Sequence, residues 1–353
     1  MKEENAAFDD MTVSDSGTLA AAAEEKDVLV PKKKKTINRA KLQDNLWGWA
    51  FVILLVLGTT VFVYIAFIIT LILSFTAYRG GNLFEYLGEM KTFNNDALYW
   101  FKHMFSNAPP DYFNPYAAGD AANFWATLGN SFFYLIGIPV GMILSILIAV
   151  CMSRDIKCTN AFRVIYYIPT VASVVSISLV WKRLFNYDGA INQLLGSSVH
   201  WLDGTAVVRK ITILILTTWK GLGGSVILFV AGLNGVNASY HEAAEIDGAN
   251  AWQIFWRITM PQLYPTIFYV LVTSVIGGMQ IFAEPDLVFN GYPVAGNQAT
   301  NGTRYNTPFV GYIYGNFEQG EWAHASALGI VLALIIFVLT LIQFGLDSRR
   351  DKI

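Results

Sequence analysis

Six long apolar segments follow a polar start of the chain, at about residues 49–75, 132–152, 164–184, 211–233, 266–289 and 325–346. A helix needs about 20 apolar residues to cross the hydrocarbon core of a bilayer. Backbone polar groups in that core must be hydrogen-bonded within the protein, so the segments are expected to be helices. The pattern predicts an all-α, polytopic membrane protein with six transmembrane helices.

Two of these spans contain residues that do not suit a plain apolar helix. The fourth holds Lys220 together with Gly221, Gly223 and Gly224, glycines that could open the helix. The fifth becomes polar near its end, at residues 284–286. Ionisable groups at membrane depth are costly, so both places are candidates for functional positions.

The composition supports a membrane protein and excludes several other classes. Hydrophobic residues make up 54% of the 353 residues and charged residues only 14%, with a mean hydropathy of +0.43, whereas a soluble domain is about 25% charged. The low charge content disfavours a soluble enzyme or a disordered chain, and a net charge of -2 gives no basic footprint for nucleic acid. Two cysteines are too few for a disulfide scaffold or a cysteine-rich metal site.

The distribution of Lys and Arg predicts the orientation of the chain. With six spans, the side that holds both termini has 15 of these residues and the other side has eight, while Lys220 lies within the membrane. Because cytoplasmic loops carry the excess of positive charge, both termini are predicted to be cytoplasmic. The four lysines at 32–35 are then an anchor on the inner face.

Three regions follow from this topology. Residues 1–44 form a polar tail, expected to be mobile and cytoplasmic. Residues 45–348 form the transmembrane domain, and residues 349–353 a short cytoplasmic C-terminus. The outer loop at about residues 76–131 is long and aromatic, so it is expected to fold or to dock on something outside.

Residues 236–261 connect spans four and five on the cytoplasmic side, and their pattern predicts a helix, a tight turn and a second helix. Asp247-Gly248 breaks the first helix, since glycine permits a positive φ, and Asn250 can cap the second. Trp252, Phe255 and Trp256 are of the kind enriched at interfaces. From these residues alone, an amphipathic helix packed on the membrane explains the pattern as well as a docking loop does.

This segment resembles the EAA loop of the membrane subunits of ATP-binding-cassette (ABC) importers. It has Glu-Ala-Ala at 242–244 and Asp-Gly-Ala at 247–249, then Phe255, Ile258 and Pro261 at the family's spacing, with Met260 where the family usually has Leu. The resemblance implies the type I ABC importer permease fold, with 236–261 as its coupling loop. It also implies that five residues contact a cytoplasmic ATPase and transmit its closure to the membrane helices: Glu242, Ala243, Ala244, Asp247 and Gly248.

Further stretches resemble the sugar-permease subfamily, and within it the first permease of the maltose and glycerol-phosphate type. They are residues 167–170, 179–182 and 231–233. This resemblance implies a permease in a bacterial cytoplasmic membrane that imports a carbohydrate by alternating access. Its implied partners are a second permease in a heterodimer, two ATPase subunits that bind ATP and Mg²⁺, and an extracytoplasmic solute-binding protein. No nucleic-acid partner is expected.

The chain itself is predicted to be a non-catalytic transport subunit without a cofactor. The sequence has no G-x-x-x-x-G-K-[S/T] motif, so ATP hydrolysis falls to the partner ATPases. The stretch His241-Glu242-x-x-Glu245 lacks the second histidine of a zinc-protease motif, and no metal site is predicted. The other three histidines, His103, His200 and His324, are expected to be solvated.

A path for sugar needs hydrogen-bonding groups and aromatic faces at membrane depth. The candidates are Trp219, Lys220, Gln280, Phe282 and Glu284, with Tyr167 as a further aromatic. The resemblance implies a cavity built from spans three to five. Alternatively, Lys220 snorkels or pairs with Glu284 as a structural contact, and the aromatics pack between helices.

Other functions remain open. The solute could be a polyol or glycerol phosphate. An ion-coupled secondary carrier without an ATPase would need paired ionisable residues deep in several spans, and only Lys220 is clearly deep. A membrane enzyme is disfavoured, because no nucleophile and base stand at a recognisable spacing.

Overall fold

The computed structural model describes residues 39–78, 80–81, 96–107, 120–153, 159–289 and 306–350. Every regular element in these residues is a helix, which confirms the predicted all-α class. Most of the predicted tail (residues 1–38), much of the two long outer loops (82–95, 108–119 and 290–305) and residues 351–353 lie outside the described residues. The chain divides into two units, residues 1–63 and 64–353, each of which is described by itself.

The first unit contains helix α1 (Arg39–Thr59), which leads into the π-helical segment η1 (Thr60–Ile65). Its apolar side chains are strongly exposed, with Phe51 at 73% and Phe62 at 81%. A helix that exposes so much apolar surface on all sides suits lipid rather than water. The first predicted span is therefore helical, as expected.

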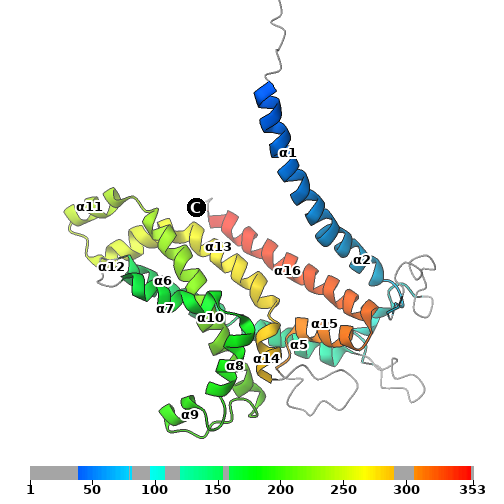
Figure 1. The fold of residues 1–353 in the computed structure, drawn as a ribbon. Coiled ribbons are helices and arrows are strands. Elements are labelled where there is room, and N and C mark those ends of the chain that lie inside the picture. The colour runs from blue at the N-terminus through cyan, green and yellow to red at the C-terminus, as the bar shows by residue number, and fades with distance from the viewer. Residues whose placement is uncertain are drawn as a thin grey trace, which may run out of the picture. The chain divides into compact units, whose positions relative to one another are not determined.

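The second unit contains the other helices (Figure 1). They are α2 (Ala66–Leu73), α4 (Tyr99–His103), α5 (Ala121–Tyr134), α6 (Gly137–Met152), α7 (Thr159–Val171), α8 (Val174–Leu184), α9 (Ala190–Leu195), α10 (Ala206–Asn234), α11 (Ala238–Ile246), α12 (Ala251–Ile254), the π-helical η4 (Phe255–Thr259), α13 (Met260–Met279), α14 (Ala283–Phe289), α15 (Phe309–Glu318) and α16 (Trp322–Arg350). Within this unit α10 packs against α6, α7 and α13, and α16 packs against α2, α13 and α15. Helix α11 lies at the upper left of the unit and α9 at its bottom (Figure 1).

Among the described residues, five helices are long and apolar enough to cross a membrane, or six if one bent pair counts as a single span. The bent pair is the third predicted span, which was expected to be one helix. Instead α7 and α8 meet at 100°, because Ser173 takes an extended backbone (φ -57°, ψ 132°) and starts α8. The apolar pattern of a segment is the same whether its helix is straight or broken, so this pattern could not predict the bend.

Two further expectations about the spans are corrected. The glycines of the fourth span do not open it: α10 is helical throughout, and Gly223 and Gly232 lie where neighbouring helices approach closely. The fifth span was predicted to reach residue 289, but α13 ends at Met279 and α14 begins at Ala283 after a short break. Small residues in membrane helices often serve close packing rather than opening.

Gly223→Ala is expected to destabilise the protein, whereas Gly224→Ala is not. A Cβ on Gly223 would overlap the Thr170 hydroxyl and the Tyr166 carbonyl oxygen of α7, but a Cβ on Gly224 would make an ordinary contact at 3.7 Å from Thr170 Cγ2. Overpacking of this kind costs about 1–3 kcal/mol. Thermal unfolding of the two variants in detergent tests this, and equal melting temperatures would contradict the assigned α7–α10 contact.

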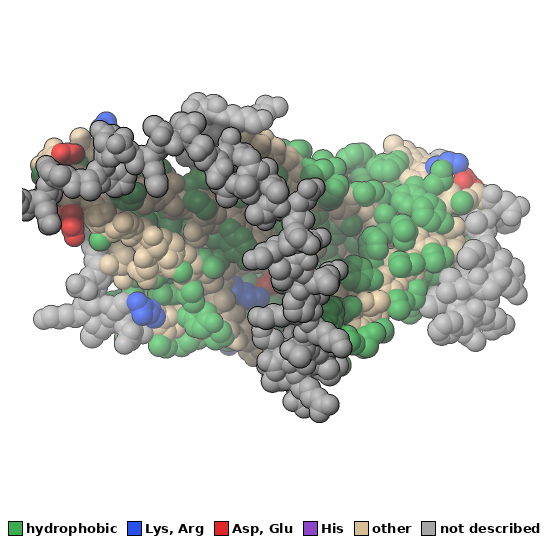
Figure 2. Space-filling model, turned by 90° about the horizontal axis from the view of Figure 1, so that it is seen from above, with side chains coloured by type: hydrophobic (Ala, Val, Ile, Leu, Met, Phe, Trp, Pro, Cys, Tyr) green, Lys and Arg blue, Asp and Glu red, His purple; other side chains and the backbone are tan. Residues whose placement is uncertain are grey.

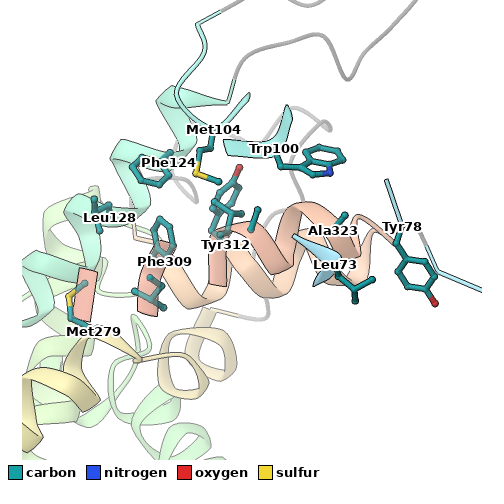
Figure 3. Packing of buried hydrophobic residues seen from close by; sticks show 13 residues of the cluster. Leu73, Tyr78, Trp100, Met104, Phe124, Leu128, Met279, Phe309, Tyr312 and Ala323 are labelled. Atoms are coloured by element: carbon teal, nitrogen blue, oxygen red, sulfur yellow. The ribbon is translucent and has the colours of Figure 1, made fainter. Parts of the chain in front are cut away.

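A buried cluster joins the ends of several helices of the second unit (Figure 3). Trp100 of α4 and Phe124 of α5 lie in it beside Phe309 and Tyr312 of α15. The Trp100 indole N–H donates to the Thr76 carbonyl oxygen at 2.8 Å. Thus part of the long aromatic loop after the first span folds back onto the chain itself.

Two histidines take part in this cluster, so the expectation that they are solvated is wrong. His324 is 2% exposed and stacks on Trp100 with ring centroids 4.9 Å apart. His103 is half-buried next to it, and burial, followed by the neighbouring His324, lowers the pKa of His103 to about 4. Both histidines lie where the end of an apolar helix meets a loop. The sequence pattern places such a junction outside the core.

Apolar side chains also cover broad areas of the described surface, with Lys, Arg, Asp and Glu in few places (Figure 2). On α6, Ile143 is 60% exposed, and on α16, Phe337 is 59% exposed. Exposed apolar area of this extent marks contact with lipid or with other membrane subunits.

Candidate functional site

The segment between α10 and α13 folds as the predicted helix, turn and helix. Asn237 caps α11 by accepting a hydrogen bond from the Ser239 N–H at 3.0 Å. Gly248 has a φ of +77°, and its N–H donates to the Glu245 carbonyl oxygen at 3.0 Å. Asn250 and Gln253 then form a reciprocal capping box that starts α12. Local sequence signals therefore fix each end of the turn.

The second helix of this segment differs from the expectation of one regular helix. Helix α12 has only four residues and continues as the π-helical η4 before α13 begins. Contact with α11 is made here, since Thr259 Oγ1 lies 3.3 Å from His241 Nε2. A π-helical turn often marks a functional position, because it shifts the register of the side chains that follow.

Four of the five residues assigned to ATPase contact are exposed: Glu242, Ala243, Asp247 and Gly248. The fifth, Ala244, is 9% exposed and supports α11 from its inner side. Large apolar side chains stand beside them, with Ile246 at 87% and Trp252 at 68% exposure. A concavity of about 290 Å³ lies between α11 and the start of α13, lined by Tyr240, Ala243, Ala244, Asp247, Arg257, Ile258, Pro261 and Gln262. Apolar anchors around a concavity suit a protein partner.

A larger cavity, of about 490 Å³, lies among the helices of the second unit. It is lined from α5 and α6, α10, α13 and α14 by Tyr134, Gly137, Ile138, Gly141, Met142, Ser145, Thr217, Thr218, Gly221, Ser225, Ser274, Gly277, Gly278, Gln280, Ile281, Phe282, Ala283 and Glu284. The lining therefore comes from the second, fourth and fifth predicted spans, whereas the resemblance implied spans three to five; no residue of α7 or α8 is in this lining.

The predicted path residues are only partly brought together. Gln280, Phe282 and Glu284 line the cavity. Lys220 reaches it through its ion pair with Glu284, with Nζ 2.6 Å from Oε1 and side chains 25% and 14% exposed. Trp219 is not among the lining residues and packs on Trp181 of α8, with centroids 5.2 Å apart. The structural pairing of Lys220 with Glu284 and the packing of Trp219 were both among the alternatives.

The lining also contains small polar residues that the sequence reasoning missed. Ser145 and Thr218 have buried hydroxyl oxygens without a hydrogen-bond partner in the described part of the chain. A signal was present: small residues recur every fourth position at 137, 141 and 145 and again at 217, 221 and 225, which places each set on one helix face. Buried hydroxyls that face a cavity need a partner, and solute hydroxyls or water can supply it.

The cavity is close to electrically neutral. Glu284 is the one charged residue in its described lining, and Lys220 neutralises it. Hydroxyls, an amide and aromatic faces remain for a ligand, which is the chemistry that binds neutral polar solutes.

Sequence comparison gives one family match, over residues 137–352, to the family described as the binding-protein-dependent transport system inner membrane component. The chain is 30% identical to the probable ABC transporter permease protein YesP of Bacillus subtilis over 90% of this chain and 94% of that protein. It is 28% identical to the lactose transport system permease protein LacF of Rhizobium radiobacter, over 64% of this chain and 77% of LacF. It is 27% identical to the multiple sugar-binding transport system permease protein MsmF of Streptococcus mutans, over 88% of this chain and 98% of MsmF.

Among solved structures, the fold is similar to a chain of a bacterial alginate ABC transporter in complex with a periplasmic protein bound to an alginate pentasaccharide. The TM-score is 0.68, with 18% identity, and the match covers 89% of this chain and 98% of that chain. At 18% identity this similarity shows the fold alone, which is the helical fold of ABC importer membrane subunits.

Proposed function

The chain belongs to the family of binding-protein-dependent transport system inner membrane components, and we propose that it is the permease subunit of an ATP-driven importer that moves a carbohydrate into the cytoplasm. The observation that carries this proposal is the exposed turn at Asp247–Gly248, fixed by capping on both sides and set beside apolar anchors. Such a rigid projection on a multi-pass membrane protein suits a moving partner that must push on the helices.

The proposed assembly pairs this chain with a second permease, two ATPase subunits and an extracytoplasmic solute-binding protein. ATP and Mg²⁺ are bound by the ATPase subunits. Both termini and the coupling loop face the cytoplasm, in accord with the excess of Lys and Arg on that side. The host membrane is the cytoplasmic membrane of a bacterium.

The coupling loop works by differential contact. A partner shifts a conformational equilibrium only by the difference in its affinity for the two states, so the ATPase must bind the loop differently when open and closed. Glu242, Ala243, Asp247 and Gly248 offer that contact, and His241 joins α11 to Thr259 of η4. Since η4 runs directly into α13, a push on the loop reaches the helix that lines the cavity.

A neutral sugar is favoured as the solute over glycerol phosphate. The described lining offers no unpaired cation for a phosphate, because Lys220 is already bound to Glu284. It offers hydroxyls of Ser145 and Thr218 for sugar hydroxyls and the ring of Phe282 for stacking. Relatives named for lactose and for multiple-sugar transport support the same choice.

Glu242→Lys tests the proposal, and it is expected to lower ATP-dependent uptake at least about tenfold, corresponding to ~1.4 kcal/mol of lost contact. The carboxylate is exposed, so the change should not unfold the chain. Uptake and ATP hydrolysis are measured with the partner subunits reconstituted in vesicles. Asp188→Lys, the same charge change at an exposed position between α8 and α9, is the matched control.

Two results would contradict the proposal. One is wild-type uptake by Glu242→Lys with the ATPase subunits still bound. The other is uptake that depends on a proton gradient and does not depend on ATP. That result would favour an ion-coupled carrier that uses the Lys220–Glu284 pair.

A further inference from the structure

A separate groove of about 400 Å³ lies between α7 and α10, away from the cavity described above. It is lined by Arg163, Val164, Tyr166, Tyr167, Ile227, Val230, Ala231 and Asn234. None of these residues lines the larger cavity or the concavity of the coupling loop. The groove follows the half of α10 that leads towards α11.

The shape of the groove follows from side-chain size. At the end of the groove that lies away from the coupling loop, Gly223 lets α7 approach α10 closely. There the Thr170 hydroxyl donates to the Lys220 carbonyl oxygen at 3.1 Å. Further along, Val230 and Asn234 of α10 line one side of the groove, and Arg163 and Val164 of α7 line the other. The groove is therefore closed at the tight contact and open towards the coupling-loop end.

The chemistry of the groove changes along its length. Val164, Ile227, Val230 and Ala231 make an apolar floor. Arg163 and Asn234 stand at the open end, and both side chains are exposed. No acidic group forms an ion pair with Arg163 in the part of the chain that the structure describes.

We propose that this groove binds an anionic phospholipid, with the phosphate on the Arg163 guanidinium and one acyl chain along the apolar floor. A single amphiphile satisfies both ends of the groove, and guanidinium binds phosphate in a bidentate manner. Basic pockets between membrane helices on the cytoplasmic side hold anionic headgroups in this way. The inference rests on the orientation given in the proposed function, which puts the open end of the groove at the cytoplasmic headgroup level.

The test measures the lipid that stays bound to the intact complex, purified with its partner subunits. The complex is titrated in detergent with phosphatidylglycerol and, separately, with phosphatidylcholine, and bound lipid is counted by native mass spectrometry. Preferential retention of phosphatidylglycerol is expected. Arg163→Gln should weaken that retention about tenfold, while Arg183→Gln, an exposed arginine in α8, should leave it unchanged.

A second variant examines the apolar floor. Ala231→Phe places a large side chain in the groove and should lower retention of both lipids. Equal retention by wild type and Arg163→Gln would overturn the proposal. So would cross-linking of a Tyr167→Cys variant to the second permease, since another protein would then cover the groove. Because retention is read without transport, a Glu242→Lys complex that fails to import but retains lipid separates this inference from the proposed function.

Discussion

Gly248→Pro is expected to abolish ATP-dependent uptake while the chain still inserts and the ATPase subunits still hydrolyse ATP. Gly248 has a φ of +77°, and proline holds φ near about -65°. Proline would also remove the N–H that donates to the Glu245 carbonyl oxygen. The turn must then rearrange, at a cost of about 3 kcal/mol or more, and α11 is displaced from η4.

A graded series at this position makes the test specific to the backbone. Left-handed φ is tolerated best by glycine, next by asparagine, and at ~1–2 kcal/mol by other residues. Uptake should therefore fall in the order Gly, Asn, Ala, Pro. The open space around a Cβ at Gly248 means that Gly248→Ala tests conformation and not a clash.

The measurement is uptake per ATP hydrolysed in reconstituted vesicles. Gly196→Pro, at a glycine of positive φ that ends α9, controls for the insertion of proline at a left-handed turn far from the coupling loop. Wild-type coupling in Gly248→Pro would show that the turn does not transmit the motion of the ATPase.

The helix and turn of the coupling loop up to the start of α12 could be predicted because their signals are local. A residue that favours positive φ, two caps and a run of helix formers lie within residues 237–253, and each acts on its near neighbours. The fold class was equally accessible, since apolar length decides it. What failed were features that depend on distant partners, such as the burial of His324 against Trp100.

The lining of the cavity could not be predicted for the same reason, because it depends on residues that are distant in the sequence. Its residues come from three stretches of the chain that meet only in the folded state, and the spacing of small residues gives one face of each helix but not which faces meet. The expected wall from the third span is not part of this lining. Glu284 does line the cavity, and it was singled out from the cost of an ionisable group at depth, which is a property of position and needs no partner.

The Lys220–Glu284 pair is expected to be both a structural contact and part of the solute site, and a double-mutant cycle separates the two roles. Lys220→Met and Glu284→Gln each leave one group without its partner. The side chains are 25% and 14% exposed, so each single change should cost about 1–3 kcal/mol, less than the ~3–5 kcal/mol of a fully buried pair. Lys220→Met/Glu284→Gln removes both groups and should recover most of that stability.

Uptake is expected to behave differently from stability in this cycle. Glu284 lines the cavity, so the double variant should fold like wild type in thermal unfolding and still need a higher solute concentration for half-maximal uptake. A sugar hydroxyl that loses its carboxylate partner accounts for that difference, because hydrogen bonds to charged groups contribute about 1.5–3 kcal/mol. If uptake instead returns together with stability, the pair only joins α10 to α14, and the solute contacts lie on the hydroxyls of the opposite wall.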